Sequence, residues 1–305
     1  MKILFLPFAK IELASSRLRA WWIAERLGAD CHMWDGQIDL LMDYDVVVFQ
    51  KQWDQARIEA YHKTSKAMRI LKEAGKRVIW DLCDPIWWWI PKDAFQAHAS
   101  HCSNIVVSSE GLADDLRPLG YNPFLSVKRS VIEDRLPFQQ GTKEHKEVEI
   151  PTLVWFGHST NRLPNLIGQT IVWKRLMEAD NIPFKMRIID DMPEMDQTFA
   201  FLSTNGRFEY RRFHYATEHK DILDCDVALL PPYPNPWGRM KGRVKWMTAA
   251  WAGLPIVDGN DYTLLADLLK NPISRQTFGE SNRFIAERDY EIGKSIQEWK
   301  ELLGC

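Results

Sequence analysis

The chain has 305 residues, of which 46% are hydrophobic, and its formal net charge is −2. It is long enough to fold as two domains of ordinary size, each with its own buried core. The near-zero net charge excludes an overall basic field that would draw the protein to nucleic acid or to an anionic membrane. No segment approaches the roughly 20 apolar residues of a membrane-spanning helix, so we expect no membrane span.

The N-terminus and the cysteines both indicate a cytoplasmic protein. The first residues, MKILFLPFAKIELASS, hold a short apolar run interrupted by Pro7, which favours a buried strand over a secretion signal. The five cysteines are scattered and form no Cys-x-x-Cys pair, which is typical of reduced thiols and argues against a structural zinc site. The carboxylates of residues 188–196, IIDDMPEMD, have no His or Cys beside them, so we expect a helix cap or a solvated loop there and no metal site.

Short apolar runs rich in β-branched residues recur along the chain, with helical stretches between them. They lie at 2–8, 45–50, 77–83, 104–109, 152–157, 186–190, 227–231 and 255–259. This alternation predicts parallel sheets covered by helices on both faces. The polar stretch from Glu133 to Ile150 separates the runs into two sets and is the predicted interdomain linker. Near the C-terminus, apolar residues at near-helical intervals over 282–304 predict one or two amphipathic helices.

Two carboxylates end the third apolar run, RVIWDLC. Ligands of open parallel sheets bind beyond the carboxyl ends of the strands, which is where Asp81 and Asp84 are expected. A carboxylate at this position can take the proton of an acceptor hydroxyl. Pro85 directly after Asp84 also fits a turn or a helix cap, so that alternative stays open.

Aromatic and basic residues of the first half are candidates for acceptor binding. Trp87, Trp88 and Trp89 are consecutive, so they cannot all point into one core, and at least one should be exposed or cover a ligand. Arg17 and Arg19 open a predicted helix, where the dipole favours anions, and they face either an anionic ligand or solvent.

The run 152–156 is followed by Gly157, His158 and Ser159, a small turn that can bring backbone amides close to a phosphate. An ordinary turn between a strand and a helix explains the same residues equally well. Neither G-x-G-x-x-G nor G-x-x-x-x-G-K-[ST] occurs.

The stretch 241–257, KGRVKWMTAAWAGLPIV, is typical of a helix that stops at Gly253 before a short strand. Lys241, Arg243 and Lys245 crowd the predicted helix start, where the dipole disfavours each cation by roughly 0.3–1 kcal/mol. An anion in front of them would remove the conflict. Lys241 and Lys245, four residues apart, would share a helix face suited to a diphosphate. A solvated basic face is the alternative.

These segments resemble those of family-4-type glycosyltransferases of the GT-B fold. The stretch 241–257 is similar to the K-S-x-x-K-x-x-E-x-x-A-x-G-x-P-V-V segment of that family, with matches at Lys241, Lys245 and Gly253. SSRLRAWWIAERL, RVIWDLCDPIWW and NIVVSSEGLADDLRPLGYNPFLSVKRSV resemble other family segments in the same order. The resemblance therefore spans nearly the whole chain.

The resemblance implies an α/β chain with two doubly wound, Rossmann-like domains that face a central cleft. It implies an N-terminal acceptor-binding domain over 1–135 and a nucleotide-sugar-binding domain over 151–283. A helical segment over 284–305 is expected to pack back on the N-terminal domain.

The activity implied by the resemblance is metal-independent transfer of a sugar from a nucleoside diphosphate sugar, UDP-linked, to an acceptor hydroxyl, with no cofactor. The acceptor is either a saccharide or glycoconjugate or a hydroxymethylated base in DNA, as in phage enzymes that modify their own genomes. The candidate residues are Asp84 and Asp81 for catalysis, Gly157, His158, Ser159, Lys241, Arg243, Lys245 and Thr248 for the donor, and Arg17, Arg19, Trp87 and Trp88 for the acceptor.

The sequence also departs from the family. Relatives carry a Glu that binds the donor ribose where this chain has Thr248, and the other Glu of that pattern falls on Met240. Thr cannot accept two hydrogen bonds as a carboxylate does, so the mode of ribose binding stays open. A non-catalytic nucleotide-sugar- or glycan-binding protein on a GT-B scaffold is the alternative function. A DNA acceptor would use cations such as Arg17, Lys51, Arg69 and Lys72.

Overall fold

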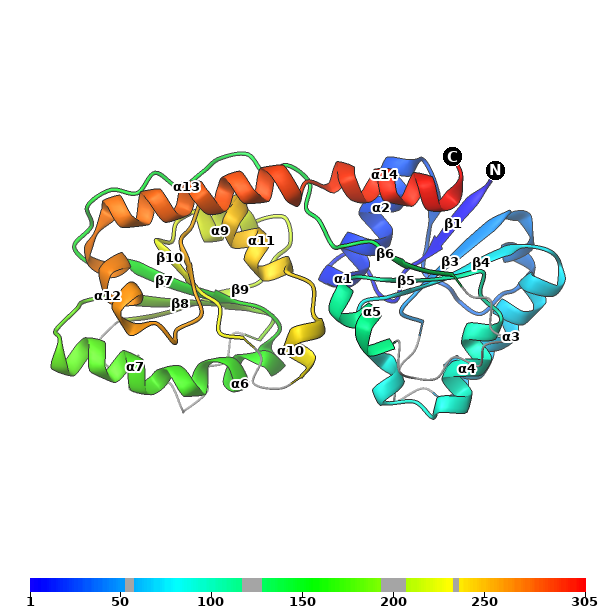
Figure 1. Ribbon diagram of the computed structural model, residues 1–305, viewed down its shortest axis with the longest axis horizontal. Helices are drawn as coiled ribbons and strands as arrows, with labels where there is room; N and C mark the ends of the chain where they lie inside the picture. Colours follow the sequence, from blue (N-terminus) through cyan, green and yellow to red (C-terminus); the bar gives the residue numbers. More distant parts are fainter. Residues whose placement is uncertain (53–57, 117–127, 193–206, 233–235) are drawn as a thin grey trace. The chain divides into compact units, whose positions relative to one another are not determined.

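The computed structural model describes residues 1–52, 58–116, 128–192, 207–232 and 236–305. The chain divides into two compact units, both visible in Figure 1. The first unit comprises Met1–Arg135, Arg239–Gly242 and Ile292–Cys305, and the second comprises Leu136–Gly238 and Arg243–Glu291.

The first unit contains a six-stranded parallel sheet in the order β2-β1-β3-β4-β5-β6. Its strands are β1 (Ile3–Leu6), β2 (Asp30–Cys31), β3 (Val46–Gln50), β4 (Arg77–Leu82), β5 (Asn104–Val107) and β6 (Lys128–Val131). Its helices are α1 (Ala14–Ser16), α2 (Trp22–Leu27), α3 (Ile58–Glu73), α4 (Lys92–Ser100), α5 (Glu110–Leu116) and α14 (Ile292–Leu303). A π-helical turn over Arg17–Trp21 joins α1 to α2.

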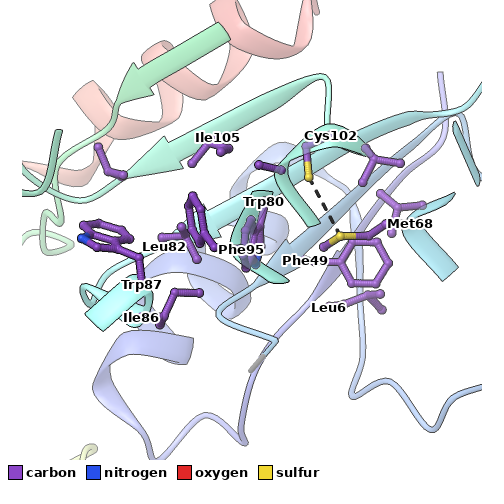
Figure 2. Packing of buried hydrophobic residues seen from close by; sticks show 14 of the residues in the cluster. Leu6, Phe49, Met68, Trp80, Leu82, Ile86, Trp87, Phe95, Cys102 and Ile105 are labelled. Atoms are coloured by element: carbon purple, nitrogen blue, oxygen red, sulfur yellow. Dashed lines mark hydrogen bonds between the residues drawn. The ribbon is translucent and has the colours of Figure 1, made fainter. Parts of the chain in front are cut away.

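The strands β1, β3, β4 and β5 are buried on both faces because successive side chains point into different cores. Leu4 and Trp80 lie in the core formed with α3, α4 and α5, whereas Phe5 and Ile79 lie in the core formed with α2 and α14. Figure 2 shows the first of these cores, in which Trp80 packs against Phe95 with ring centroids 5.2 Å apart. Helices therefore cover both faces of the sheet, as the apolar runs predict.

The second unit contains a five-stranded parallel sheet in the order β11-β10-β7-β8-β9. Its strands are β7 (Thr152–Phe156), β8 (Lys185–Asp190), β9 (Phe208–Arg212), β10 (Val227–Leu229) and β11 (Ile256–Val257). Its helices are α6 (Arg162–Leu166), α7 (Thr170–Lys174), α9 (Glu218–Leu223), α11 (Val244–Trp251), α12 (Tyr262–Lys270) and α13 (Pro272–Asp289). The helix α10 (Trp237–Met240) precedes α11.

Helix α11 ends as its sequence predicts, at Gly253 in the left-handed conformation with a φ of 72°. Helix α13 passes so close to this turn that a Cβ on Gly279 would lie 2.0 Å from the carbonyl oxygen of Gly253. Only glycine permits this approach. The two helices are thereby held against each other beside the sheet.

All eight apolar runs form strands, and the predicted α/β class is confirmed. The sequence missed β2, β6 and β9, which lack a continuous apolar run: β2 has two residues, and β6 and β9 read KRSV and FEYRR. Within the predicted linker, Leu136 already belongs to the second unit and pairs with Glu291. Residue 284 lies inside α13, and the C-terminal residues of the first unit begin at Ile292.

Two further observations concern the chain as a whole. No helix in the described ranges is long and apolar enough to cross a membrane. All five cysteines lie in described residues and are free thiols.

A buried guanidinium connects three elements of the first unit. Arg19 in the π-helical turn donates from Nε and Nη2 to Asp81 in β4, with distances of 2.5–3.0 Å. Its Nη1 donates to the carbonyl of Ile132 and to Oδ1 of Asp134, both at 2.8 Å and both just beyond β6. Arg19 and Asp81 are almost completely inaccessible to solvent. The turn and the carboxyl ends of β4 and β6 are therefore fixed to one cation.

Asp81→Asn preserves the shape of this side chain but removes the charge that faces Arg19. Removing one partner of a buried ion pair costs about 3–5 kcal/mol, and since Asp134 remains we expect the free energy of unfolding to fall by about 3 kcal/mol. Urea denaturation followed by circular dichroism measures the change.

Glu73→Gln is the matched control for this substitution. It breaks the exposed pair between Arg69 and Glu73 in α3, whose contribution to stability should stay below about 0.5 kcal/mol. An Asp81→Asn protein as stable as this control would show that the buried pair does not hold the first unit together.

Candidate functional site

Charged and polar side chains follow four neighbouring strands of the first sheet, close to where each strand ends. Lys51 follows β3, Asp84 follows β4, Ser109 follows β5 and Asp134 follows β6. The carboxyl ends of these strands meet at one edge because the strands are parallel and adjacent. This edge is the candidate site of the first unit.

Asp84 is buried and lies between two lysines. The ammonium group of Lys51 contacts Oδ2 of Asp84, and the Nζ of Lys241 lies 3.6 Å from Oδ1. The thiol of Cys83 adds a weak hydrogen bond to Oδ2 at 3.8 Å. Within the described residues the carboxylate contacts these side chains and caps no helix. The turn alternative is observed, because the carbonyl of Asp84 accepts from the amide of Ile86 at 2.8 Å, and the site role of the Asp84 carboxylate stays a prediction.

The segment 240–242 binds to the same edge at three successive residues. Met240 is buried in the core of the first unit, and its carbonyl accepts a hydrogen bond of 2.6 Å from the hydroxyl of Ser109. Lys241 reaches Asp84, and a Cβ on Gly242 would lie 2.8 Å from Oδ2 of Asp134. This segment belongs to the first unit, although α11 begins two residues later.

The position of this segment corrects one prediction. Helix α11 starts at Val244, so Lys241 lies outside it and does not share a helix face with Lys245. Glycine at position 242 and the contacts of residues 240–242 hold the backbone out of the helix. In this structure the ammonium of Lys241 therefore forms an ion pair with the carboxylate of Asp84.

The consecutive tryptophans divide between the core and the surface. Trp87 is buried against Phe95, whereas the side chain of Trp88 is 43% exposed. Both indoles donate to one carboxylate oxygen of Asp115, from Trp87 at 2.7 Å and from Trp88 at 2.8 Å. This shared acceptor fixes the orientation of Trp88 while much of its ring remains on the surface. Trp88 is thus available to stack against a ligand.

Four of the predicted site residues are corrected because they are buried and have internal partners. Asp81 and Arg19 form the ion pair described above, so neither the proposed base nor the proposed acceptor contact fits them. Arg17 is buried, donates to the carbonyls of Ile11 and Glu12 in the first loop, and lies 5.4 Å from the ring of Trp22. Trp87 belongs to the core.

The carboxyl edge of the second sheet brings Gly157 and Lys245 together. The ammonium of Lys245, in the first turn of α11, lies 4.5 Å from the ring centroid of Trp155 in β7. A Cβ on Gly157, directly after β7, would lie 2.6 Å from that ammonium nitrogen. The absence of a side chain at position 157 therefore makes room for the lysine. These two predicted donor-site residues are neighbours in space, although 88 positions separate residues 157 and 245 in the chain.

The turn after β7 is stabilised by hydrogen bonds to β8 and the residue after it, and by one within the turn. The amide of Gly157 donates to Ile189, and the amide of Ser159 donates to Oδ1 of Asp191 at 2.7 Å. The ring of His158 accepts from the amide of Thr160 and also lies 3.3 Å from Oδ2 of Asp191. Burial raises the pKa of Asp191, but the hydrogen bonds from Ser159 outweigh it and leave that pKa below its usual value. Since these amides have partners, the ordinary-turn explanation is favoured over an amide cradle for phosphate.

Arg243 and Thr248 flank Lys245 on α11. Arg243 immediately precedes the helix, is partly exposed, and donates to the hydroxyl of Tyr290 at 3.2 Å. Thr248 is buried, and its hydroxyl donates to the carbonyl of Val244 one turn earlier at 2.9 Å. The Thr248 oxygen can still accept a hydrogen bond.

The sequence interpretation did not include Asp115 and Asp134 in the site, and it considered Lys51 only as a cation for a DNA acceptor. Lys51 directly follows an apolar run, so the strand-end rule that selected Asp84 could also have found it. Asp115 and Asp134 become relevant only through contacts with Trp88 and Gly242, which are distant in the chain and carry no local signal. In the described part of the chain, no three His, Cys, Asp or Glu side chains gather into a metal site.

No family model and no curated protein matches the chain. Among solved structures it is similar to HepE of Anabaena in complex with UDP, with 14% identity over 100% of both chains and a TM-score of 0.66. It is similar to an alpha-glucosyltransferase in complex with UDP and a 13-mer DNA containing an HMU base, with 9% identity over 99% of this chain and 98% of that chain and a TM-score of 0.66. A third similar structure is the lipopolysaccharide outer core galactosyltransferase WaaB, with 12% identity over 99% of both chains and a TM-score of 0.57. The chain therefore has the GT-B fold, as its sequence predicts.

Proposed function

We propose that this protein is a glycosyltransferase that moves a sugar from a nucleoside diphosphate sugar, UDP-linked, to an acceptor hydroxyl without a metal ion. The observation that carries the proposal is the ammonium of Lys245, held at the start of α11 against Trp155 and Gly157. An anion that binds in front of a helix N-terminus is stabilised by the helix dipole and by a cation placed there. The GT-B fold and the UDP bound in two similar structures support a nucleoside diphosphate as this anion.

The donor is assigned to the second unit. Lys245 and Arg243 supply positive charge where the diphosphate gains negative charge, as its bond to the anomeric carbon breaks. Gly157 leaves space for the lysine, and the oxygen of Thr248 is a candidate acceptor for a ribose hydroxyl. Lys241, first assigned to the same clamp, is reassigned to the acceptor side because it contacts Asp84.

The acceptor is assigned to the first unit, with Asp84 as the base. The acceptor hydroxyl gives its proton to Asp84, and its oxygen forms the new bond to the anomeric carbon. The diphosphate leaves with the electron pair of the broken carbon–oxygen bond. This assignment holds for transfer with inversion, whereas a retaining enzyme does not require such a base.

A saccharide is the favoured acceptor. The exposed indole of Trp88, fixed by Asp115, offers a face on which a sugar ring can stack. The cations considered for DNA are engaged elsewhere: Arg17 is buried, Lys51 contacts Asp84, Arg69 pairs with Glu73 and Lys72 donates to the carbonyl of Ser100. If DNA is the acceptor, the affinity of the protein for a DNA duplex should fall steeply as the salt concentration increases.

The alternative function is a binding protein that retained the scaffold without catalysis. The Thr at position 248, where relatives carry a ribose-binding Glu, supports this alternative. Binding of a nucleotide-sugar without any turnover would favour it.

A donor screen tests the proposed function. The protein is incubated with several UDP-, GDP- and ADP-sugars in EDTA, with and without saccharide acceptors, and nucleotide release is measured. We expect slow release from a UDP-sugar with water as acceptor, unchanged by added magnesium. Activity that EDTA abolishes and magnesium or manganese restores would contradict the metal-independent chemistry.

Lys245→Ala should weaken binding of the UDP-sugar at least about tenfold, because one charge-assisted contact is worth roughly 1.4 kcal/mol. Isothermal titration calorimetry with UDP gives the dissociation constant. Lys220→Ala removes an exposed lysine from α9 of the same unit and should leave the constant unchanged. Equal affinities for the two variants would remove Lys245 from the donor site.

Asp84→Asn should reduce turnover by roughly 10²–10⁴-fold in an inverting enzyme while donor affinity stays near normal, because the proton acceptor is lost and the second unit is unaltered. Asp93→Asn, an exposed carboxylate at the start of α4, is the control and should be silent. Nuclear magnetic resonance of the product gives the anomeric configuration. An inverting enzyme indifferent to Asp84→Asn would exclude Asp84 as the base.

A further inference from the structure

Lys51 adopts a backbone conformation that lysine ordinarily avoids. Its φ is 49°, in the left-handed region, and Asn181 is the one other non-glycine residue with a positive φ in the described part of the chain. Asparagine tolerates this region because its short side chain bonds locally, whereas lysine gains no such compensation. Unfavourable backbone conformations persist where surrounding contacts impose them, and they concentrate at functional sites.

The contacts of Lys51 account for this conformation. Its amide donates to the carbonyl of Asp81 at 2.8 Å, next to the last residue pair of β3 and β4, Gln50 and Asp81. Its ammonium contacts Oδ2 of Asp84 and lies 5.3 Å from the ring centroid of Phe8. The left-handed turn thus directs the side chain from the end of β3 to the carboxylate beyond β4, although glycine would form the turn more easily.

The two oxygens of Asp84 are held differently. Oδ2 has the Lys51 ammonium, 20% exposed, and the thiol of Cys83. Oδ1 has Lys241, which is 41% exposed and lies at the longer distance of 3.6 Å. An incoming hydroxyl can therefore replace Lys241 at Oδ1 while Lys51 keeps Oδ2 in place.

We propose that Lys51 is a positioning residue of the acceptor site, which holds Oδ2 of Asp84 so that Oδ1 receives the proton of the acceptor hydroxyl. The inference rests on the proposed function. The hydroxyl O–H bond breaks, the proton moves to Oδ1, and the oxygen bonds to the anomeric carbon as the diphosphate departs with its electron pair. Lys51 touches neither the donor nor the acceptor and acts through Asp84.

The test distinguishes the effect of the Lys51 backbone conformation on stability from the effect of its charge on turnover. Lys51→Gly removes the ammonium and relieves the left-handed backbone, so the melting temperature should stay within a few degrees of the wild-type value while kcat for UDP release falls at least tenfold. The KM for the donor should change less than twofold, because the donor belongs to the second unit. Lys51→Arg keeps a cation and should recover most of the lost kcat. Lys51→Met tests the same loss of charge with the backbone cost retained.

Asn181→Gly is the matched control, because it changes the other left-handed residue, which is exposed and precedes the amino end of β8 in the second unit. It should leave kcat and KM unchanged. Wild-type kcat in Lys51→Gly, or an Arg variant as impaired as the Gly variant, would overturn the inference. A raised KM for the donor with an unchanged kcat in Lys51→Gly would also overturn the inference. A wild-type protein that neither releases nor binds UDP would instead overturn the proposed function itself, and calorimetry with UDP distinguishes the two failures.

Discussion

The arrangement of the first unit depends on the buried guanidinium of Arg19. Burial lowers the pKa of this side chain, but the carboxylates of Asp81 and Asp134 raise it and prevail, so the group stays charged. A buried charge is costly unless it is paired and hydrogen-bonded, and the planar fork of arginine fixes the directions of its partners. Strand β4, the chain after β6 and the first helical turn are thereby locked together. Asp84 follows Asp81 by three residues in the chain. Asp134, the other carboxylate that pairs with Arg19, lies next to Gly242.

The strand-end rule predicted the position of the site better than the roles of its residues. It selected Asp81 and Asp84 together, yet Asp81 is inside β4 and fully buried, whereas Asp84 lies beyond the strand at the carboxyl edge. Arg17 and Arg19 were assigned to a ligand because their charges stood at a predicted helix start. Their actual partners are a loop backbone and carboxylates more than 60 residues away, which local sequence cannot reveal. The fold was more predictable, because eight of the eleven strands in the described residues carry their own apolar run in the local sequence.

The first residue of α11 is a second case in which contacts between distant residues, invisible in the local sequence, decide the structure. The Ala-rich stretch and the stop at Gly253 predict this helix and its end, and both are observed. Its first residue was misplaced because Met240, Lys241 and Gly242 are held by Ser109, Asp84 and Asp134, contacts that join segments more than 100 residues apart. Local preference for helix is weak at a glycine, so these tertiary contacts decide where the helix begins.

The three cations before and within α11 therefore do not act as one cluster. The charge of Lys241 is balanced by Asp84, and Arg243 has the hydroxyl of Tyr290 as a partner. Lys245 lies over the π face of Trp155 in the second unit, with its ammonium 4.5 Å from the ring centroid. Lys245 and Arg243 therefore remain as the two cations that we assign to the donor, both at the start of α11. The carboxylate that balances Lys241 is also the one to which we assign the proton of the acceptor hydroxyl. Asp84 is therefore both the counter-ion of this lysine and the proposed base.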